Sequence, residues 1–428
     1  MSEEIKNLQE ELNDQMQIRR DKLAEYEADG IYPFGQRFVV KDHAKDIKND
    51  FLNYEDQPVV IAGRLMTMRS HGKTAFANIR DLSGDIQVYF RKDVLGEDNY
   101  KYVKMLDIGD IVGLEGHVFK THSGEVTIKV DKLTLLSKAL RPLPEKWHGL
   151  KDTELRYRQR YVDLIVNPEV RDTFVKRSKI VAKIREYMMN DGFMEVETPM
   201  MHPIPGGAAA RPFITMRIAP ELYLKRLIVG GMERVFEMNR CFRNEGIDNR
   251  HNPEFTTIES YQAYGDVEDA IRLTENLVSY CAQEVLGTQE ITYQGTEINL
   301  TPPWNRITMA EGVKKYTGED FDAVTTVEEA RAIADRLNVE YTNNDGIGKI
   351  LNACFEDYVE ENLIQPTIVY GHPKEISPLA KASRENPLAT ERFEAFIYGR
   401  ELANGFSELN DPIDQKQRFL DQLKEREA

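Results

Sequence analysis

Residues 233–261 read ERVFEMNRCFRNEGIDNRHNPEFTTIESY, and this stretch decides the fold of the second half of the chain. Its two ends suit extended strands, in which every second side chain lies on the same face. The segment between them is rich in Gly, Asn and Asp, which favour turns, so it predicts an antiparallel hairpin with a long loop. On one face of this hairpin we expect four side chains to lie together: Arg243, Glu245, Glu259 and Tyr261.

The stretch LANGFSELND, residues 402–411, repeats this logic and predicts another strand. Three of its side chains are expected on one face: Asn404, Phe406 and Glu408. Glu394 and Glu401, just upstream, differ in strand parity, so both reach one metal ion only if a bulge or bend lies between them. Carboxylates held in this way suit Mg²⁺, which prefers oxygen ligands. The alternative is that each of these glutamates lies on the surface.

These segments predict a site for a charged ligand, because charges on a buried face are costly unless they meet a ligand or each other. The arginine suits a phosphate, and the aromatic faces suit a flat ring. Three carboxylates beside Tyr261 make a negative pocket that favours a cationic ligand: Glu221, Glu259 and Glu408. From the residues alone, we predict a protein that binds a nucleoside triphosphate and a small cation.

Residues 57–137 have a different pattern: five short runs in which apolar and polar residues alternate, separated by turns that contain Gly. This pattern predicts a small closed or Greek-key barrel, and an OB-type barrel is the leading candidate. One face of such a barrel can display aromatic and polar groups to single-stranded bases, and Arg69, Phe76 and Gln87 lie in or next to the strands. A generic barrel with Phe76 in its core fits the pattern equally well.

The remaining segments predict helices around these two parts. Residues 3–28 form an amphipathic pattern, and basic residues such as Arg19 and Lys22 lie either on a solvated face or against an RNA backbone. A linker leads to a helix that opens at Pro168, followed by a short strand. This unit either docks against its own copy in a two-fold dimer or packs within the monomer. Beyond residue 253 the order of elements predicts an α+β domain on an antiparallel sheet.

The composition excludes several classes of protein. A net charge of −16 argues against indiscriminate nucleic-acid binding, because the mean field repels phosphate. The three cysteines are scattered and odd in number, so they fit neither a disulfide framework nor a zinc site and indicate a reducing cytoplasm. No stretch is long and apolar enough to span a bilayer, and the acidic N-terminus is not a secretory signal.

Several strings resemble the class II aminoacyl-tRNA synthetases. RVFEMNRCFRNEG…RHNPEFT is similar to their second signature motif, and the helix–strand unit that ends at Pro199 is similar to the first. HPIPGGAAARPF, RIAPELYLKRLIVGG, GHPKEISPLAK and GRELANGFSELNDP make the resemblance specific to bacterial lysyl-tRNA synthetases. The resemblance implies four parts: a helical extension (1–50), an OB-fold anticodon-binding β-barrel (51–140), a linker (141–166) and an α+β class II catalytic domain on an antiparallel sheet (167–428).

The resemblance also implies an activity and its partners. Members of the family are cytoplasmic homodimers that activate L-lysine with ATP and Mg²⁺ and then esterify the 3′ end of tRNA(Lys). The positions that match the family's catalytic residues are Arg243, Glu245 and His251. Those that match its ATP-binding residues are Arg243, Glu245, Arg250, His251, Asn252 and Phe255. The positions of the Mg²⁺ carboxylates are Glu394 and Glu401.

The substrate pockets carry over in the same way. The resemblance assigns the lysine pocket to Gly207, Glu221, Glu259, Tyr261, Asn404, Phe406 and Glu408. It assigns the anticodon contacts to Arg69, Phe76, Gln87 and Glu125. No side-chain nucleophile is implied, because the lysine carboxylate itself attacks the α-phosphate, and positioning and charge neutralisation supply the catalysis.

The sequence departs from the family pattern in two places. The third class II motif, a Gly-rich junction that ends in Asp-Arg, does not occur in the 428 residues. Its Arg grips ATP in the family, so we expect a chain that ends at Ala428 to activate lysine poorly or not at all. Around Thr215–Arg217 the family has a longer strand segment that contains His, so a central strand is expected to be shortened.

Two other functions stay open at this point. One is a catalytically impaired relative that keeps only tRNA binding or dimerisation. The other is a class II synthetase for aspartate or asparagine, which shares the barrel and the dimer. This second alternative predicts a basic amino-acid pocket, and the three acidic residues argue against it.

Overall fold

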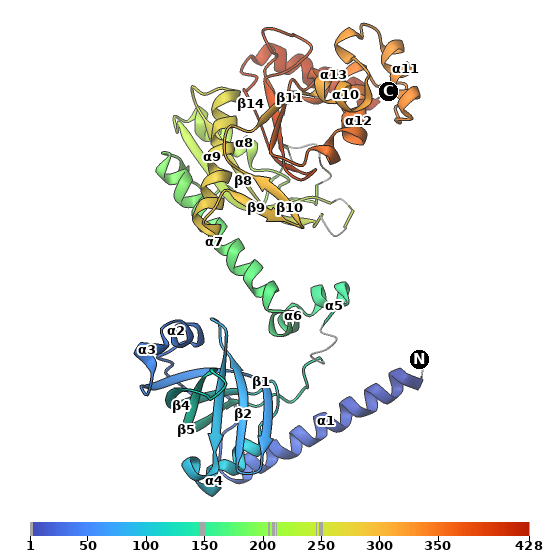
Figure 1. Cartoon of the computed structure of the whole chain (residues 1–428). Coiled ribbons are helices and arrows are strands. Elements are labelled where there is room, and N and C mark those ends of the chain that lie inside the picture. The colour runs from blue at the N-terminus through green and yellow to red at the C-terminus, as the bar shows by residue number, and fades with distance from the viewer. Residues whose placement is uncertain are drawn as a thin grey trace. The chain divides into compact units, whose positions relative to one another are not determined.

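The computed structural model describes residues 3–144, 150–203, 206–207, 210, 212–244, 246–247 and 251–427. The chain divides into two compact units, Met1–Asp172 and Thr173–Ala428, each with its own core (Figure 1). The division falls inside one long helix, α7 (Pro168–Asn190). No helix within the described ranges is both long and apolar enough to cross a membrane.

The first unit contains the predicted five-stranded barrel. Its strands are β1 (Pro58–His71), β2 (Thr74–Arg80), β3 (Asp85–Arg91), β4 (Ile111–Lys120) and β5 (Val126–Ser137). They close in the order β1-β2-β3-β5-β4, with β3 and β5 parallel and the other neighbours antiparallel. Inward side chains alternate with outward ones along β2 and β3, so Ala75, Ala77 and Ile79 of β2 are buried.

The N-terminal helix α1 (Glu3–Ala28) is held to the barrel by its basic residues. Arg19 is only 7% exposed, and its guanidinium donates to the carbonyl oxygens of Ala139 and Arg141. Lys22 forms an ion pair with Asp107 at 2.6 Å. The prediction of a solvated face was therefore wrong for Arg19, which is buried within the unit, and the RNA-backbone contact stays a prediction.

Short helices surround the barrel and lead out of it. They are α2 (Ala44–Asn49), α3 (Phe51–Tyr54), α4 (Lys92–Met105), α5 (Thr153–Arg158) and α6 (Arg160–Val166). The helix α7 begins at Pro168, as expected, and the chain turns at Gly192, which has a φ of 83° that suits glycine. The strand that follows, β6 (Met194–Glu195), is shorter than the sequence pattern indicated.

The second unit is built on two sheets and a small hairpin. The first sheet has the order β6-β7-β8, with β7 (Arg234–Phe242) and β8 (Glu254–Gln262) antiparallel. The second has the order β11-β12-β13-β14, formed by Asn305–Thr308, Thr367–Tyr370, Arg392–Phe396 and Glu401–Phe406. The hairpin pairs β9 (Glu290–Tyr293) with β10 (Thr296–Asn299). The predicted antiparallel arrangement is found except between β6 and β7 and between β11 and β12, which are parallel.

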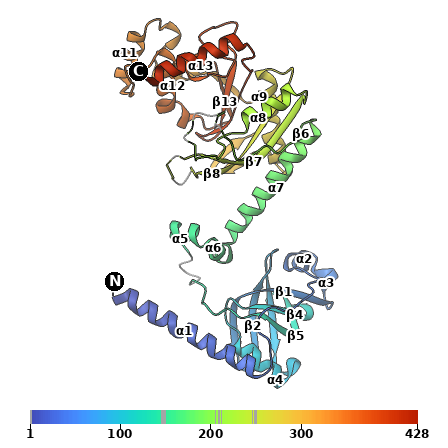
Figure 2. The same cartoon turned by 180° about the vertical axis from the view of Figure 1, so that it is seen from behind.

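One helix, α9 (Val267–Leu286), packs against both sheets. Ile271 lies in a cluster with Phe393 and Ala395 of β13, and Leu273 and Leu277 pack against the cluster around Phe236 of β7. The other helices are α8 (Glu221–Val229), α10 (Met309–Thr317), α11 (Val327–Leu337), α12 (Ile347–Tyr358) and α13 (Pro412–Glu427). Figure 2 shows α12 and α13 near β13, away from α7. Three 3₁₀ turns complete the unit: Phe321–Ala323, Glu360–Asn362 and Lys374–Ile376.

The stretch around Thr215–Arg217 forms no strand within the described residues, in line with the shortening we expected. It contains one isolated bridge, between Met201 and Met216. Arg217 is fully buried and forms an ion pair with Glu237 at 2.8 Å. Its Nε also donates to the carbonyl oxygen of Arg240, so Arg217 ties this stretch to β7.

Candidate active site

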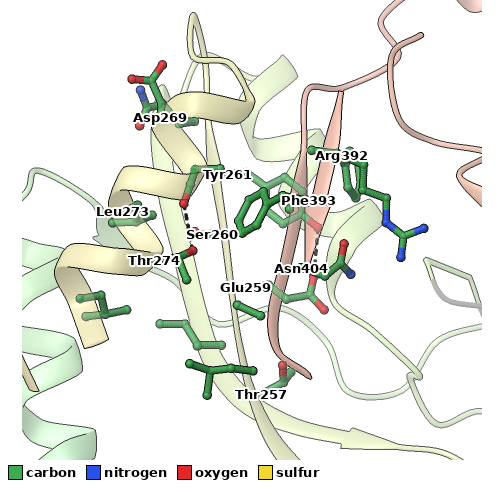
Figure 3. Close-up of a pocket in the computed structure, with 18 of the residues that line it drawn as sticks. Thr257, Glu259, Ser260, Tyr261, Asp269, Leu273, Thr274, Arg392, Phe393 and Asn404 are labelled. Carbon is green, nitrogen blue, oxygen red and sulfur yellow. Dashed lines mark hydrogen bonds between the residues drawn. The ribbon is translucent and has the colours of Figure 1, made fainter. Parts of the chain in front are cut away.

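A cavity of about 1960 Å³ in the second unit lies between β8 and β14, each the last strand of its sheet (Figure 3). Figure 3 looks into this space, with Glu259 and Tyr261 on β8 and Asn404 on β14. Ten residues that the sequence assigned to ligands line it: Gly207, Glu221, Arg243, Phe255, Glu259, Tyr261, Glu401, Asn404, Phe406 and Glu408. Segments nearly 200 positions apart in the chain thus meet at one site.

Other predicted residues lie elsewhere. Glu394 lines a smaller cavity of about 260 Å³, which it shares with Glu401. His251 and Asn252 are exposed and do not line either cavity. Glu245 and Arg250 lie outside the described residues.

The β7–β8 hairpin forms as predicted, but its register differs from the expected pairing. Glu259 lies opposite Glu237, and Tyr261 lies opposite Val235. Arg243 comes just after β7, where its backbone N–H donates to the carbonyl of Pro253 at 2.9 Å. Its guanidinium lies 5.0 Å from the centre of the Phe255 ring. The hairpin therefore does not pair Arg243 with Glu259 and Tyr261, although all three line the same cavity. Strand parity depends on local alternation, whereas the register depends on pairing along the whole hairpin.

Arg243 has an unused donor. Its Nε is buried and has no hydrogen-bond partner among the described residues. A buried donor without a partner costs free energy, so a ligand with acceptor oxygens would be stabilised there. The aromatic ring of Phe255 beside it offers a flat surface. This pair fits the phosphate and the base of a nucleotide.

Three carboxylates gather at the other end of the large cavity. Glu221 is buried at the start of α8, and Gly207 lies against it with a φ of +92°. A Cβ at Gly207 would come within 3.0 Å of the Glu221 Cβ, so this position leaves space only for glycine. Tyr261 donates its hydroxyl to Glu259 at 3.0 Å, yet burial raises the pKa of Glu259 to about 7. Burial also raises the pKa of Glu408.

The pocket also contains a cation that was not predicted from the sequence. Lys225, one turn after Glu221 on α8, places its Nζ 2.5 Å from Glu221 Oε1 and 2.9 Å from Glu408 Oε2. The same Nζ lies 6.0 Å from the centre of the Tyr261 ring and 5.6 Å from that of Phe406. Burial alone would lower the pKa of Lys225, but the charges of Glu221 and Glu408 outweigh it and raise the pKa. The i, i+4 spacing was the only signal in the sequence, and the contact with Glu408 was not visible in it.

The second predicted acid pair meets because the strand is irregular. Glu394 lies opposite Asn404, and the register shifts between Ala395 and Phe396 before Glu401 is reached. This is the bulge or bend that the parity of the two residues required, and both carboxylates line the smaller cavity.

Two residues that the sequence analysis did not assign hold Glu394. The buried His372 has its Nε2 3.4 Å from Glu394 Oε2, and Arg392 contacts the other carboxylate oxygen. Burial would raise the pKa of Glu394, but these contacts outweigh it and lower the pKa. Burial, followed by the charge of Glu394, raises the pKa of Glu401 to about 7.

This acid pair fits a divalent cation that brings other ligands with it. No three His, Cys, Asp or Glu side chains in the described ranges come together to hold a metal by themselves. Mg²⁺ commonly binds through one or two carboxylates together with substrate phosphates and water. Two carboxylates that repel each other are stabilised when a cation lies between them.

The four barrel residues lie on or next to neighbouring strands, but only Arg69 and Phe76 are directly opposite each other. Arg69 of β1 lies opposite Phe76 of β2, and Phe76 lies opposite and stacks on Tyr89 of β3, with ring centres 4.4 Å apart. Phe76 is partly exposed between buried neighbours, so it is not a core residue. Gln87 accepts a hydrogen bond from Thr127 at 2.8 Å.

Glu125 lies just before β5 and forms an ion pair with Lys48 at 3.1 Å. The sequence analysis missed Tyr89 and also Phe119, whose ring centre lies 6.1 Å from that of Tyr89. The outward face therefore carries more aromatic surface than we predicted, of the kind on which bases stack.

Comparison with known proteins places both units. Residues 152–428 match the family model of tRNA synthetases class II (D, K and N), and residues 59–136 match that of the OB-fold nucleic acid binding domain. The lysine–tRNA ligase of Thermoanaerobacter pseudethanolicus is 57% identical over 438 residues, which cover 100% of this chain and 88% of the relative. That of Carboxydothermus hydrogenoformans is 57% identical over 427 residues, covering 97% and 88%. That of Bacillus subtilis is 55% identical over 445 residues, covering 100% and 89%.

These matches confirm the predicted fold class, an OB-fold barrel followed by a class II catalytic domain. They also confirm the resemblance drawn from the motifs around Arg243 and Glu408. The chain therefore belongs to the class II aminoacyl-tRNA synthetases, and within them to the lysine–tRNA ligase family.

Proposed function

We propose that this protein is a lysine–tRNA ligase that activates L-lysine with ATP and Mg²⁺ and transfers it to the 3′ end of tRNA(Lys). The observation that carries the proposal is the acidic part of the large cavity. There Glu221 and Glu408 hold the ammonium group of Lys225, which lies near the rings of Tyr261 and Phe406. A site of this composition suits the side chain of lysine. The names of the relatives support the same substrate.

Each residue of the amino-acid pocket is assigned to one part of the lysine substrate. Tyr261, Phe406 and Glu408 receive the side-chain ammonium, with Glu259 behind Tyr261. Gly207 and Glu221 lie at the α-amino group, and Asn404 lies at the carboxylate. An aspartate or asparagine substrate is not favoured, because three carboxylates would repel an acidic side chain and leave an amide without a charged partner.

The nucleotide lies at the other end of the cavity. Arg243 binds the α-phosphate and stabilises the charge that develops there, and its buried Nε without a partner supports this role. Phe255 stacks on the adenine. From the sequence resemblance we further assign Glu245 to the adenine amino group and Arg250, His251 and Asn252 to the phosphates.

Glu394 and Glu401 are the residues that would hold Mg²⁺. When bound, the ion neutralises phosphate charge. His372 and Arg392 keep the Glu394 carboxylate ionised and fixed in place. In this arrangement the chain contributes position and charge, and no side chain acts as a nucleophile.

The barrel and the long helix α7 suggest the macromolecular partners. We assign the anticodon loop to the face that carries Arg69, Phe76, Gln87 and Glu125, where stacked aromatic rings are partly exposed. A second copy of the chain suits α7, since Val175 and Ile180 are 42% and 39% exposed although they are apolar. We also propose a cytoplasmic location, and the boundaries given above for the four parts of the chain.

Lysine-dependent exchange of pyrophosphate into ATP tests the activation step. We expect exchange with L-lysine and none with L-aspartate or L-asparagine. Charging of tRNA(Lys) but not of tRNA(Asp) tests the transfer step. If lysine produces no exchange while tRNA(Lys) still binds, the protein is a relative that has kept only tRNA binding or dimerisation, and the enzymatic function is wrong.

A further inference from the structure

The ammonium site of the amino-acid pocket is already filled by a side chain of the protein itself. Lys225 Nζ lies 2.5 Å from Glu221 and 2.9 Å from Glu408. Four of the seven residues that we assign to the substrate contact this one group: Glu221, Tyr261, Phe406 and Glu408. The occupant is also a primary ammonium on a four-carbon stem, which is the chemistry of the substrate side chain.

The two ligands cannot share this site. The side-chain ammonium of a substrate at Glu408, and its α-ammonium at Glu221, would each meet Lys225 at short range in a partly buried pocket, where like charges repel strongly. If Lys225 leaves and a substrate ammonium enters, the charge of the pocket does not change, because one cation replaces another. The same exchange with a neutral side chain leaves Glu408 without a cation, because the only remaining ammonium of such a ligand is its α-amino group at Glu221.

Lys225 has a route out of the pocket. Its side chain is 25% exposed, whereas that of Glu221 is 8% exposed, so the lysine stem borders the open part of the cavity. Glu408, its other partner, is 40% exposed. A long side chain with several rotatable bonds can therefore withdraw into the cavity or into water without a change in the backbone of α8.

We propose that Lys225 sets the affinity and selectivity for the amino acid by occupying its ammonium site in the free protein, so that lysine binds by displacing Lys225 from Glu221 and Glu408. This inference rests on the proposed function, since it requires that the pocket binds lysine. The apparent dissociation constant for lysine is then the intrinsic value divided by the fraction of molecules in which Lys225 has left the site.

Binding measurements on the full chain test the displacement. Lys225→Met keeps the length of the stem and removes the charge, so we expect L-lysine to bind at least about threefold more tightly by isothermal titration calorimetry. Arg226→Met is the matched control, because Arg226 is an exposed cation on the same helix that lies over Tyr223, 4.8 Å from its ring centre. It should leave lysine affinity unchanged. Unchanged or weaker lysine binding by a folded Lys225→Met protein would overturn the proposal.

A chemical measurement on the unmodified protein does not depend on the folding of a variant. In the free protein the Lys225 amine is held by two carboxylates and reacts slowly with an acylating reagent. We expect saturating L-lysine to increase acetylation of Lys225 by N-hydroxysuccinimidyl acetate at least about threefold, measured by peptide mass spectrometry. L-norleucine, which keeps the α-ammonium but lacks the side-chain ammonium that would replace Lys225 at Glu408, should have no such effect. Lys132 on the barrel, whose side chain is 66% exposed, provides the reference rate.

The outcomes separate this inference from the proposed function. If lysine binds to the unmodified protein but lowers the acetylation of Lys225 or leaves it unchanged, Lys225 stays in place when lysine binds. The displacement is then wrong, while the proposed function stands. If calorimetry detects no lysine binding to the unmodified protein, the proposed function fails and the displacement fails with it.

Discussion

The second unit contains two clusters of glutamates, one in each cavity, and their negative charges are balanced differently. In the large cavity, Glu221 and Glu408 share an internal cation, Lys225. In the smaller cavity, Glu394 is held by His372 and Arg392, whereas Glu401 forms no ion pair within the described part of the chain and has its pKa raised to about 7. Glu221 and Glu408 thus have a cationic partner without any ligand, whereas Glu401 has none among the residues that the structure describes.

This difference indicates what each cavity selects. In the large cavity, a substrate has to replace the contacts that Lys225 makes with the carboxylates. This requirement favours a substrate side chain that carries an ammonium group over other side chains. A pair of carboxylates with too little positive charge around it is stabilised by any cation of suitable size that brings further oxygen ligands. Glutamates that are paired with a lysine of the protein thus give specificity for the amino acid, and glutamates that lack enough positive charge around them give affinity for the metal.

Glu401→Gln should have the largest effect. It removes a carboxylate that we propose as a Mg²⁺ ligand, and with it the positive charge that the ion would bring to the phosphates, so we expect the rate of lysine-dependent pyrophosphate exchange to fall about 10²–10³-fold. Glu360→Gln is the control, because Glu360 lines the same cavity without a proposed role in binding the ion. An equal loss in both variants would mean that the cavity responds only to its total charge.

Glu408→Gln should have the next largest effect, and on a different ligand. A hydrogen bond to a charged group contributes about 1.5–3 kcal/mol, and the 40% exposure of Glu408 favours the lower end, so we expect the KM for lysine to rise roughly 15-fold. The KM for ATP should stay nearly unchanged. Glu391→Gln, at another carboxylate that lines the large cavity, should change neither. Equal losses for lysine and ATP would contradict the role we assign to Glu408.

His372→Asn should have a smaller effect, because His372 positions Glu394 and does not touch the ligand. Residues that orient metal ligands typically contribute 10–100-fold to metal affinity, so we expect the Mg²⁺ concentration for half-maximal exchange to rise about tenfold. The rate at saturating Mg²⁺ should be kept. His202→Asn, at a buried histidine that contacts Pro199 instead, is the control. A lower rate that saturating Mg²⁺ does not restore would show that His372 does more than position Glu394.

The smallest expected effect concerns stability and pH. Burial raises the pKa of Glu259 from 4.5 to about 7 in the folded protein. The folded state therefore keeps a proton that the unfolded chain releases, and this contribution to stability is lost as the pH rises from about 4.5 through about 7. The midpoint of thermal unfolding should fall over this range, and Glu259→Gln should flatten the fall. The same slope in both proteins would assign the pH dependence to other groups.

Much of the fold could be predicted from the sequence because it depends on local patterns. Alternation between Gly-marked turns predicts the barrel strands, and Pro168 marks the start of α7. Helical signals recur in the sequence near residues 266–286, 325–337, 346–363 and 412–427, where α9, α11, α12 and α13 form. The helices α8 and α10 and the strand β11 were missed, because each is short and gives little periodicity to detect. Their formation depends on tertiary packing more than on propensity.

The sequence by itself determined the family, the barrel, the β7–β8 hairpin and the face on which Arg243, Glu259 and Tyr261 lie. These follow from residue identities at short spacings, and side-chain parity in a strand is a local property. Only the tertiary structure decided that Arg243 lies beside Phe255, that Arg19 serves packing, and that Lys225 reaches Glu408. Each of these contacts depends on strand register or on the approach of segments far apart in the chain, which local patterns do not specify.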